Sequence, residues 1–326
     1  MNNSLPLSND IIDRILTFLP SFSTLQSAIL TSKSFYEVFQ ARPKSTIRAV
    51  SFNVVGPALP QALRVLRYKP GPVYQDMTYY NPPQPELEDD HKAPITPGEC
   101  VDLVRIEETV RGLEDLFSLR STIFPPSRVA LFFFELNVSF LYRHKNCRFT
   151  TSQLSTYESH RFCRATYRIM LYYNIFSLPL LRGFEWRIDS EEEYEMEVRK
   201  TETVRAKFLS RFSTEEVYEI RCVSMFLKEV VRVMERYLHQ LEHSLEQYLA
   251  LGPDIILEEY RLLTHYGRRA KSQLTGFADK DDIYGFCEGY LSSPIQSLLT
   301  ERKVPSQDDR EVWFSILDAI EGEHDT

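Results

Sequence analysis

The residues of this sequence that could do chemistry include two histidines beside a glutamate. The run His239-Gln240-Leu241-Glu242-His243 has the spacing at which two histidines one helical turn apart bind zinc and the glutamate acts as a base. Apolar residues of the same predicted helix place both histidines on its opposite, solvated side: Met234, Leu238, Leu241, Leu245 and Tyr248. Because no further ligand is obvious, we expect no metal site, and a zinc-dependent hydrolase built on His239, Glu242 and His243 is the less favoured alternative.

Two clusters of charged residues also have both a functional and a structural interpretation. The first opens a predicted helix, where the helix dipole stabilises negative charge, and comprises Glu191, Glu192, Glu193, Glu195 and Glu197. The second, Arg161, Arg164 and Arg168, could bind a phosphate or an acidic peptide, or could pair with neighbouring acidic helices. The sequence has no glycine-rich phosphate loop, dinucleotide motif or nucleophile elbow, so we expect no enzyme, no catalytic residue and no cofactor.

The composition indicates a helical protein that works inside the cell. Of 326 residues only 11 are glycine, against 21 Phe and 18 Tyr, which disfavours a turn-rich β architecture and predicts an all-α fold. The five cysteines are scattered singly, as in proteins with reduced thiols, and we find no leader or membrane span. We therefore expect a cytoplasmic or nuclear protein without a membrane partner. The aromatic stretch 129–188 suits a core or a peptide-binding groove, with a core as the default.

Helical patterns begin near the N-terminus with three short elements. They are expected to start at Ser8 or Asn9, at Ser23 or Thr24, and at Thr31 or Ser32, with Pro20 ending the first. A fourth helix is predicted after Pro43 up to the break at Gly56, and another follows over 59–66.

The remainder of the chain divides into a proline-rich segment and a series of longer helices. Residues 69–98 contain many prolines and an acidic run, which predicts a linker or an exposed loop. Capping boxes predict helix starts at Thr96/Glu99 and at Ser213/Glu216, and Gly252 marks a stop. Beyond the helix that starts near Thr96, we expect a compact bundle of helices over 127–145, 151–176, 190–211, 213–251, 254–266 and 309–320.

The N-terminal residues resemble an F-box of the fungal type. The resemblance depends on the run 7–20, LSNDIIDRILTFLP, followed by Leu25 and by the run 31–35, TSKSF. In that family a three-helix module packs apolar residues against the adaptor of a cullin-based, SCF-type ubiquitin ligase, the rest of the chain holds the target, and catalysis takes place on other subunits. The resemblance implies adaptor binding by Leu5, Pro6, Leu7, Ile11, Ile12, Ile15, Leu16, Leu19, Pro20, Leu25 and Phe35. Ser8 stands where proline is common, and Phe35 stands at the usual tryptophan.

The resemblance implies a receptor with two functional ends. Its parts are an adaptor-docking module at 5–50, connecting helices at 51–68, the linker or loop at 69–98 and a helical substrate-recognition domain at 99–326. Residues 1–71 carry eight Lys or Arg against three Asp or Glu, within a total net charge of -8. This front end suits an acidic adaptor better than nucleic acid, since the acidic remainder repels phosphates. The protein target stays open.

The alternative is a helical scaffold or regulatory protein without a ligase role, in which the first helices belong to one continuous bundle. Exposure of Ile15, Leu16 and Leu19 would favour docking, and their burial would favour the scaffold.

Overall fold

The structure is a computed structural model that describes residues 7–68, 94–118, 154–176, 190–238, 252–266 and 290–304. Every regular element in these ranges is a helix, and none of them contains a strand. The fold is all-α, which confirms the fold class expected from the composition. No helix in the described ranges is both long enough and apolar enough to cross a membrane.

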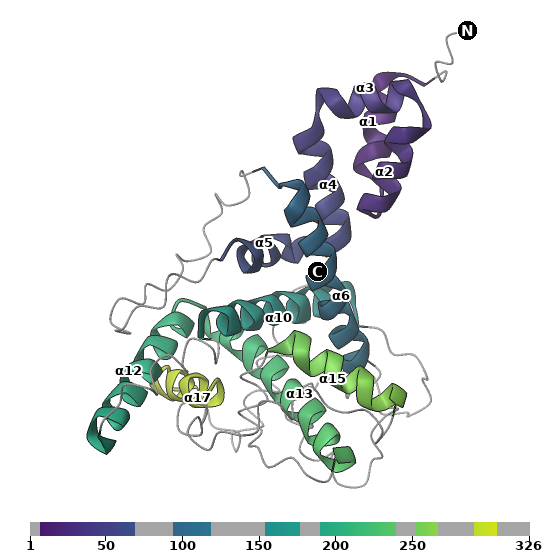
Figure 1. The fold of residues 1–326 in the computed structure, drawn as a ribbon. Coiled ribbons are helices and arrows are strands. Elements are labelled where there is room, and N and C mark those ends of the chain that lie inside the picture. Colours follow the sequence, from purple (N-terminus) through teal and green to yellow (C-terminus); the bar gives the residue numbers. More distant parts are fainter. Residues whose placement is uncertain are drawn as a thin grey trace, which may run out of the picture.

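Three short helices pack together at one end of the molecule and form what we call the N-terminal module (Figure 1). They are α1 (Asn9–Thr17), α2 (Phe22–Thr31) and α3 (Lys33–Ala41). Helix α2 begins one or two residues earlier than expected, because Ser21 and Thr24 form a reciprocal capping box. Ser32 caps α3 as predicted, and its hydroxyl accepts a hydrogen bond from the backbone N–H of Phe35 at 3.4 Å.

The N-terminal module has a small core that it shares with the next helix, α4 (Pro43–Val55). This core consists of Ile12, Leu16, Leu25, Phe35, Val38 and Val50. Because Val50 belongs to α4, the module is completed by a residue outside the three short helices. The opposite end of α4 reaches the main core through Val55, so one helix takes part in both cores.

Helix α5 (Leu59–Arg67) follows a 3-10 turn at Gly56–Ala58 and packs in the main body against α6 (Pro97–Ser118) and α10 (Thr156–Phe176). Gly56 adopts a φ of 79°, a conformation that suits glycine and lets the chain turn there. Leu59, Ala62 and Leu63 of α5 are buried in the main core. Residues 51–68, which were expected to connect the two units, therefore also contribute side chains to the core of the body.

The two ends of the proline-rich segment are held side by side. Arg67, at the end of α5, pairs with Glu99 at 2.6 Å and donates to the carbonyl oxygen of Pro94 at 3.2 Å. Glu99 also completes the predicted capping box with Thr96, accepting from its N–H at 2.7 Å, and this helix start is confirmed. Residues 69–93 themselves lie outside the described ranges.

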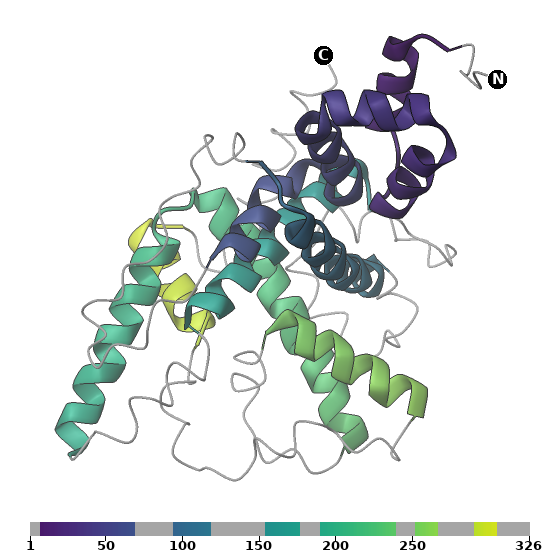
Figure 2. The same cartoon turned by 45° about the horizontal axis from the view of Figure 1, so that its top comes forward.

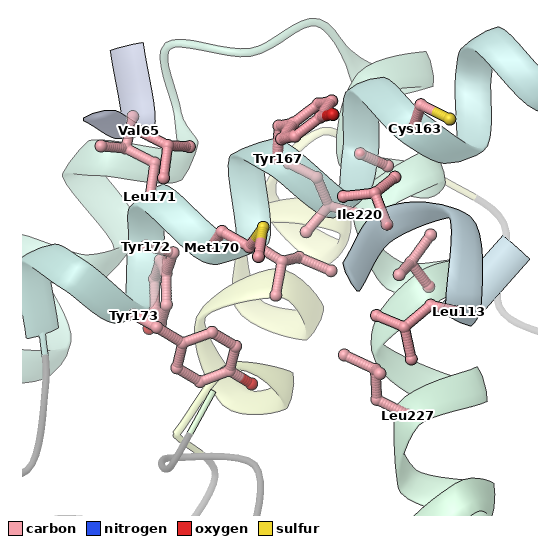
Figure 3. Packing of buried hydrophobic residues seen from close by; sticks show 14 of the residues in the cluster. Val65, Leu113, Cys163, Tyr167, Met170, Leu171, Tyr172, Tyr173, Ile220 and Leu227 are labelled. Carbon is pink, nitrogen blue, oxygen red and sulfur yellow. The ribbon is translucent and has the colours of Figure 1, made fainter. Parts of the chain in front are cut away.

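The body is built around α10, which is buried along most of its length from Phe162 onward. Helix α13 (Thr214–Leu238) packs along it, and α15 (Pro253–Tyr266) packs on α13 and α6. Figure 3 shows part of this core, where Met170 and Leu171 lie among side chains of α5, α6 and α13. Helix α12 (Glu191–Leu209) packs against α17 (Ser292–Glu301) at the far side of the body (Figure 2).

Several expected helix limits are corrected here. Helix α10 begins at Thr156 rather than 151, since Ser155 and Glu158 form a capping box: the Ser155 N–H donates to the carboxylate at 2.8 Å. Helix α17 was not predicted, because its ten residues lack strong periodicity. The capping box of Ser213 and Glu216 is confirmed. The helices expected over 127–145 and 309–320, and the end of the helix expected to reach 251, fall outside the described ranges.

Candidate functional site

Helix α1 carries apolar side chains on two sides, and only one of them is covered. Ile12 and Leu16 are fully buried in the core of the N-terminal module. On the other side, large apolar side chains keep much of their surface exposed: Leu7 37%, Ile11 47%, Ile15 38% and Phe18 79%. We call these four residues the α1 stripe.

The spacing of the α1 stripe explains why its members lie together. Ile11, Ile15 and Phe18 follow one another at intervals of four and three residues, which at about 100° per residue places them on one side of α1. Leu7 precedes the N-cap Ser8 and lies just outside the helix. Ile12 and Leu16 fall roughly 100° away from that side of the helix. The core of the N-terminal module is too small to cover both sides of the nine-residue helix α1. The α1 stripe therefore remains on the surface.

The C-terminal end of α1 is fastened to α4 by a single side chain. The amide nitrogen Nδ2 of Asn53 donates to the carbonyl oxygens of Thr17 at 2.8 Å and of Leu19 at 2.9 Å. The carbonyl group of Thr17, at the end of α1, has no partner within the helix, so one of these bonds satisfies it. The other bond holds the turn that follows the helix. Phe18 lies between the two residues, so the backbone is held on both sides of it.

The net charge of residues 7–50, which comprise the N-terminal module and the first part of α4, is positive, with five Lys or Arg against three Asp or Glu. Arg14 is exposed and lies on the same side of α1 as the α1 stripe, four residues before Phe18. Two of the acidic residues of the module are already paired: Asp13 lies 3.6 Å from Arg42, and Glu37 lies 3.5 Å from Lys33. A partner with negative charge therefore meets a favourable field here.

The residues expected to bind an adaptor divide between surface and core. Leu7, Ile11, Ile15 and Pro20 are exposed and Leu19 is half-buried, whereas the members of the module core, Ile12, Leu16, Leu25 and Phe35, are buried. Leu5 and Pro6 lie outside the described ranges. Of the three residues chosen to separate docking from a scaffold, Ile15 is exposed, Leu16 is buried and Leu19 is intermediate.

Phe18 was missing from the expected set, although it is the most exposed large apolar side chain in the described part of the chain. The sequence does contain a signal for it. Phe18 falls seven residues after Ile11, two helical turns further along the same side.

The arginine cluster of α10 is occupied by carboxylates of α13. Arg164 donates to both oxygens of Glu219, from Nη2 at 2.6 Å and from Nε at 3.1 Å, and Arg161 donates to the same carboxylate at 2.9 Å. Arg168 donates to Glu216 at 2.5 Å. The structural interpretation, pairing with a neighbouring acidic helix, is confirmed.

Protonation at this cluster follows from burial and charge. Burial alone raises the pKa of Glu216, but the backbone hydrogen bond at Ser213 and the charge and hydrogen bond of Arg168 outweigh it and lower that pKa. For His160, burial and the nearby Arg164 both lower the pKa. The lowered pKa favours the ionised form of Glu216 beside Arg168, and together with the bonds from Arg161 and Arg164 to Glu219 this pair forms a clasp between α10 and α13.

The remaining candidates do not form a chemical site in the described residues. Ser190 accepts from the N–H of Glu193 at 3.2 Å, so the acidic run starts a helix as expected. No group of three His, Cys, Asp or Glu in the described ranges is placed to hold a metal, and the zinc alternative at His239, Glu242 and His243 lies outside them.

The aromatic residues of α10 belong to the core. Tyr172 donates from its hydroxyl to the carbonyl oxygen of Tyr290 at 2.5 Å, and Tyr173 stacks on the ring of Tyr290 at 5.6 Å between centroids. This confirms the core interpretation for the described part of the aromatic stretch, of which 129–153 and 177–188 lie outside the described ranges.

The described cysteines have the character of structural residues. Cys100, Cys163 and Cys222 carry free thiols. Burial, with a smaller contribution from Glu114, raises the pKa of Cys163 to about 12, and burial raises that of Cys100 to about 11. Both thiols therefore stay protonated and are poor nucleophiles at neutral pH.

Comparison with known proteins assigns no family to the chain, so any functional proposal depends on the geometry described above. No protein-family model, no curated protein and no solved structure matches the chain.

Proposed function

We propose that this protein is a substrate receptor of an SCF-type ubiquitin ligase, in which the α1 stripe docks the ligase adaptor and the helical body holds a protein target. The observation that carries the proposal is the α1 stripe itself. Four large apolar side chains in or next to one short helix remain exposed, although the described residues form a large core elsewhere. Contiguous apolar surface of this kind is typical of protein interaction sites.

The position of the N-terminal module supports the same role. In Figures 1 and 2 the module projects from one end of the molecule, so a partner can approach α1 without meeting the body. Because α4 takes part in both cores, the module is held firmly to the body. A receptor needs this separation, with one end for the ligase and the rest free for a target.

The positive field around α1 supports an acidic adaptor as the partner. Arg14 borders the α1 stripe, and residues 7–50, which include the first part of α4, carry five Lys or Arg against three Asp or Glu. Apolar contact would supply affinity, while charge would accelerate and orient the encounter. The site of action would be the cytoplasm or nucleus, where such ligases assemble.

The alternative, a helical scaffold without a ligase role, is favoured by one observation. Leu16 is fully buried, and Phe35, which stands at the usual tryptophan of the resemblance, is buried in the same small core. In a scaffold these residues would only hold the first helices together, and adaptor binding would be absent.

The test is the affinity of the full chain for purified ligase adaptor, compared with that of Ile15→Asp. We expect the wild-type chain to bind and Ile15→Asp to lose binding, because a charge would enter the apolar contact. Val101→Asp is the matched control, since Val101 is 71% exposed on α6 of the body. If the wild-type chain shows no binding, or if Ile15→Asp binds equally well, the receptor assignment is wrong.

A further inference from the structure

We propose that Phe18 is the principal anchor of the α1 stripe and that Asn53 of α4 is the residue that positions it. This inference rests on the proposed function and extends it to two residues that the resemblance does not include. The occupant is the adaptor, an acidic protein that offers an apolar pocket.

The exposure and chemistry of Phe18 make it suitable as an anchor. Its side chain is 79% exposed, about twice the exposed fraction of Ile15, so it has the most apolar surface to bury in a complex. Aromatic side chains are over-represented among the few residues that dominate binding energy at protein interfaces. Phe18 adds nothing visible to the folded core, since it belongs to neither buried cluster.

Asn53 removes the freedom that such an anchor would otherwise have. Phe18 is the C-terminal cap of α1, a position where helices usually fray. The two hydrogen bonds from Asn53 Nδ2 to Thr17 and Leu19 fix the carbonyl groups on both sides of Phe18. A backbone that is already ordered at the anchor loses less conformational entropy on binding, so the fixed turn increases affinity.

The charges next to Phe18 favour an acidic occupant. Arg14 lies one helical turn before Phe18 and is exposed, and residues 7–50 contain five Lys or Arg against three Asp or Glu. Of those three acids, Asp13 and Glu37 are paired with Arg42 and Lys33. Each pair also cancels one basic residue, so residues 7–50 keep a net charge of five minus three, or +2, and Arg14 is the basic residue next to the anchor.

A double-mutant cycle on the full chain with purified ligase adaptor tests both parts of the inference. We expect Phe18→Ala to weaken binding by about tenfold or more. Asn53→Ala should weaken it by a smaller factor, and this factor should largely disappear when Phe18 is already alanine, because Asn53 acts through Phe18. Val101→Ala, which shortens a side chain of the body that is 71% exposed, should leave the affinity unchanged.

The outcomes separate this inference from the proposed function. If the wild-type chain binds and Ile15→Asp does not, but Phe18→Ala binds like wild type, the anchor is wrong and the receptor assignment stands. If Asn53→Ala weakens binding equally with and without Phe18, its positioning role is wrong. If the wild-type chain instead self-associates through Phe18 without binding adaptor, a second copy is the occupant, and both proposals fail.

Discussion

The guanidinium of Arg164 on α10 holds the carboxylate of Glu219 on α13 with three hydrogen bonds, although 55 residues separate them in the chain. Arg161 donates to the same carboxylate, whose side chain is only 4% exposed. A carboxylate that accepts from two arginines in a buried setting compensates charges that would otherwise be costly to bury.

Removal of Glu219 should destabilise the body strongly. Glu219→Ala leaves Arg161 and Arg164 without this carboxylate, and loss of one partner from a buried ion pair typically costs about 3–5 kcal/mol. The measurement is urea unfolding followed by circular dichroism. Glu215→Ala is the control: Glu215 also pairs with Arg161, but its side chain is 60% exposed, so the cost should stay below about 1 kcal/mol. Equal losses for the two variants would contradict the buried clasp.

Adjacent residues of α1 should respond in opposite ways to truncation. Leu16 is fully buried, so Leu16→Ala should reduce the free energy of unfolding of the N-terminal module by about 2–5 kcal/mol. Ile15 is exposed, and Ile15→Ala should change stability by less than roughly 0.5 kcal/mol while weakening adaptor binding. Hydrogen exchange in α1 measures the first effect. An Ile15→Ala module that is as unstable as Leu16→Ala would show that the stripe is covered in solution. An aspartate at Leu16 would test folding rather than docking.

The start of α6 should make stability sensitive to acid. Burial raises the pKa of Glu99, but Arg67 and Thr96 outweigh it, so the pKa lies below its ordinary value of 4.5 in the folded protein. Since the unfolded chain binds the proton more tightly, the stabilisation is complete above pH 4.5 and is lost as the pH falls through the lower folded pKa.

The variant Glu99→Gln isolates this contribution. It should lose about 1 kcal/mol at neutral pH and show a smaller decline in stability below pH 4.5 than wild type. Glu108→Gln, on an exposed position of the same helix, should follow the wild-type curve. The measurement is the midpoint of thermal unfolding from pH 7 to about pH 3. Parallel curves for wild type and Glu99→Gln would refute the assignment.

Two glycines of α6 should respond differently to a larger side chain. A Cβ at Gly112 would collide with the guanidinium of Arg261 and would lie 2.8 Å from Cδ2 of the buried Leu257, so α15 packs closely against α6 there. Gly112→Val should therefore cost about 1–3 kcal/mol. Gly98 has no atom within 4 Å of its would-be Cβ, and Gly98→Ala should be neutral or stabilising. The measurement is the midpoint of thermal unfolding of both variants. If Gly112→Val is as stable as wild type, α15 packs less closely against α6 than described.

The starts and stops of many helices follow from the sequence alone. The capping boxes of Thr96 with Glu99 and of Ser213 with Glu216 form as predicted, because their partners are three residues apart and need no other part of the chain. The break at Gly56 is likewise local, since it depends on the backbone of one residue. Helix α17 had no such local signal and was missed.

Tertiary structure alone decided which side of α1 is buried. Ile12 and Leu16 are as apolar as Ile11 and Ile15, so the periodicity of the sequence does not tell which pair faces the core. Ile12 and Leu16 are the buried pair because Val50 of α4 enters the module core beside them and because α2 and α3 pack around the same core. The bonds from Asn53 to Thr17 and from Arg164 to Glu219 likewise join distant segments. Local preference sets where a helix begins and ends, but the burial of a face depends on partners that only the folded chain brings together.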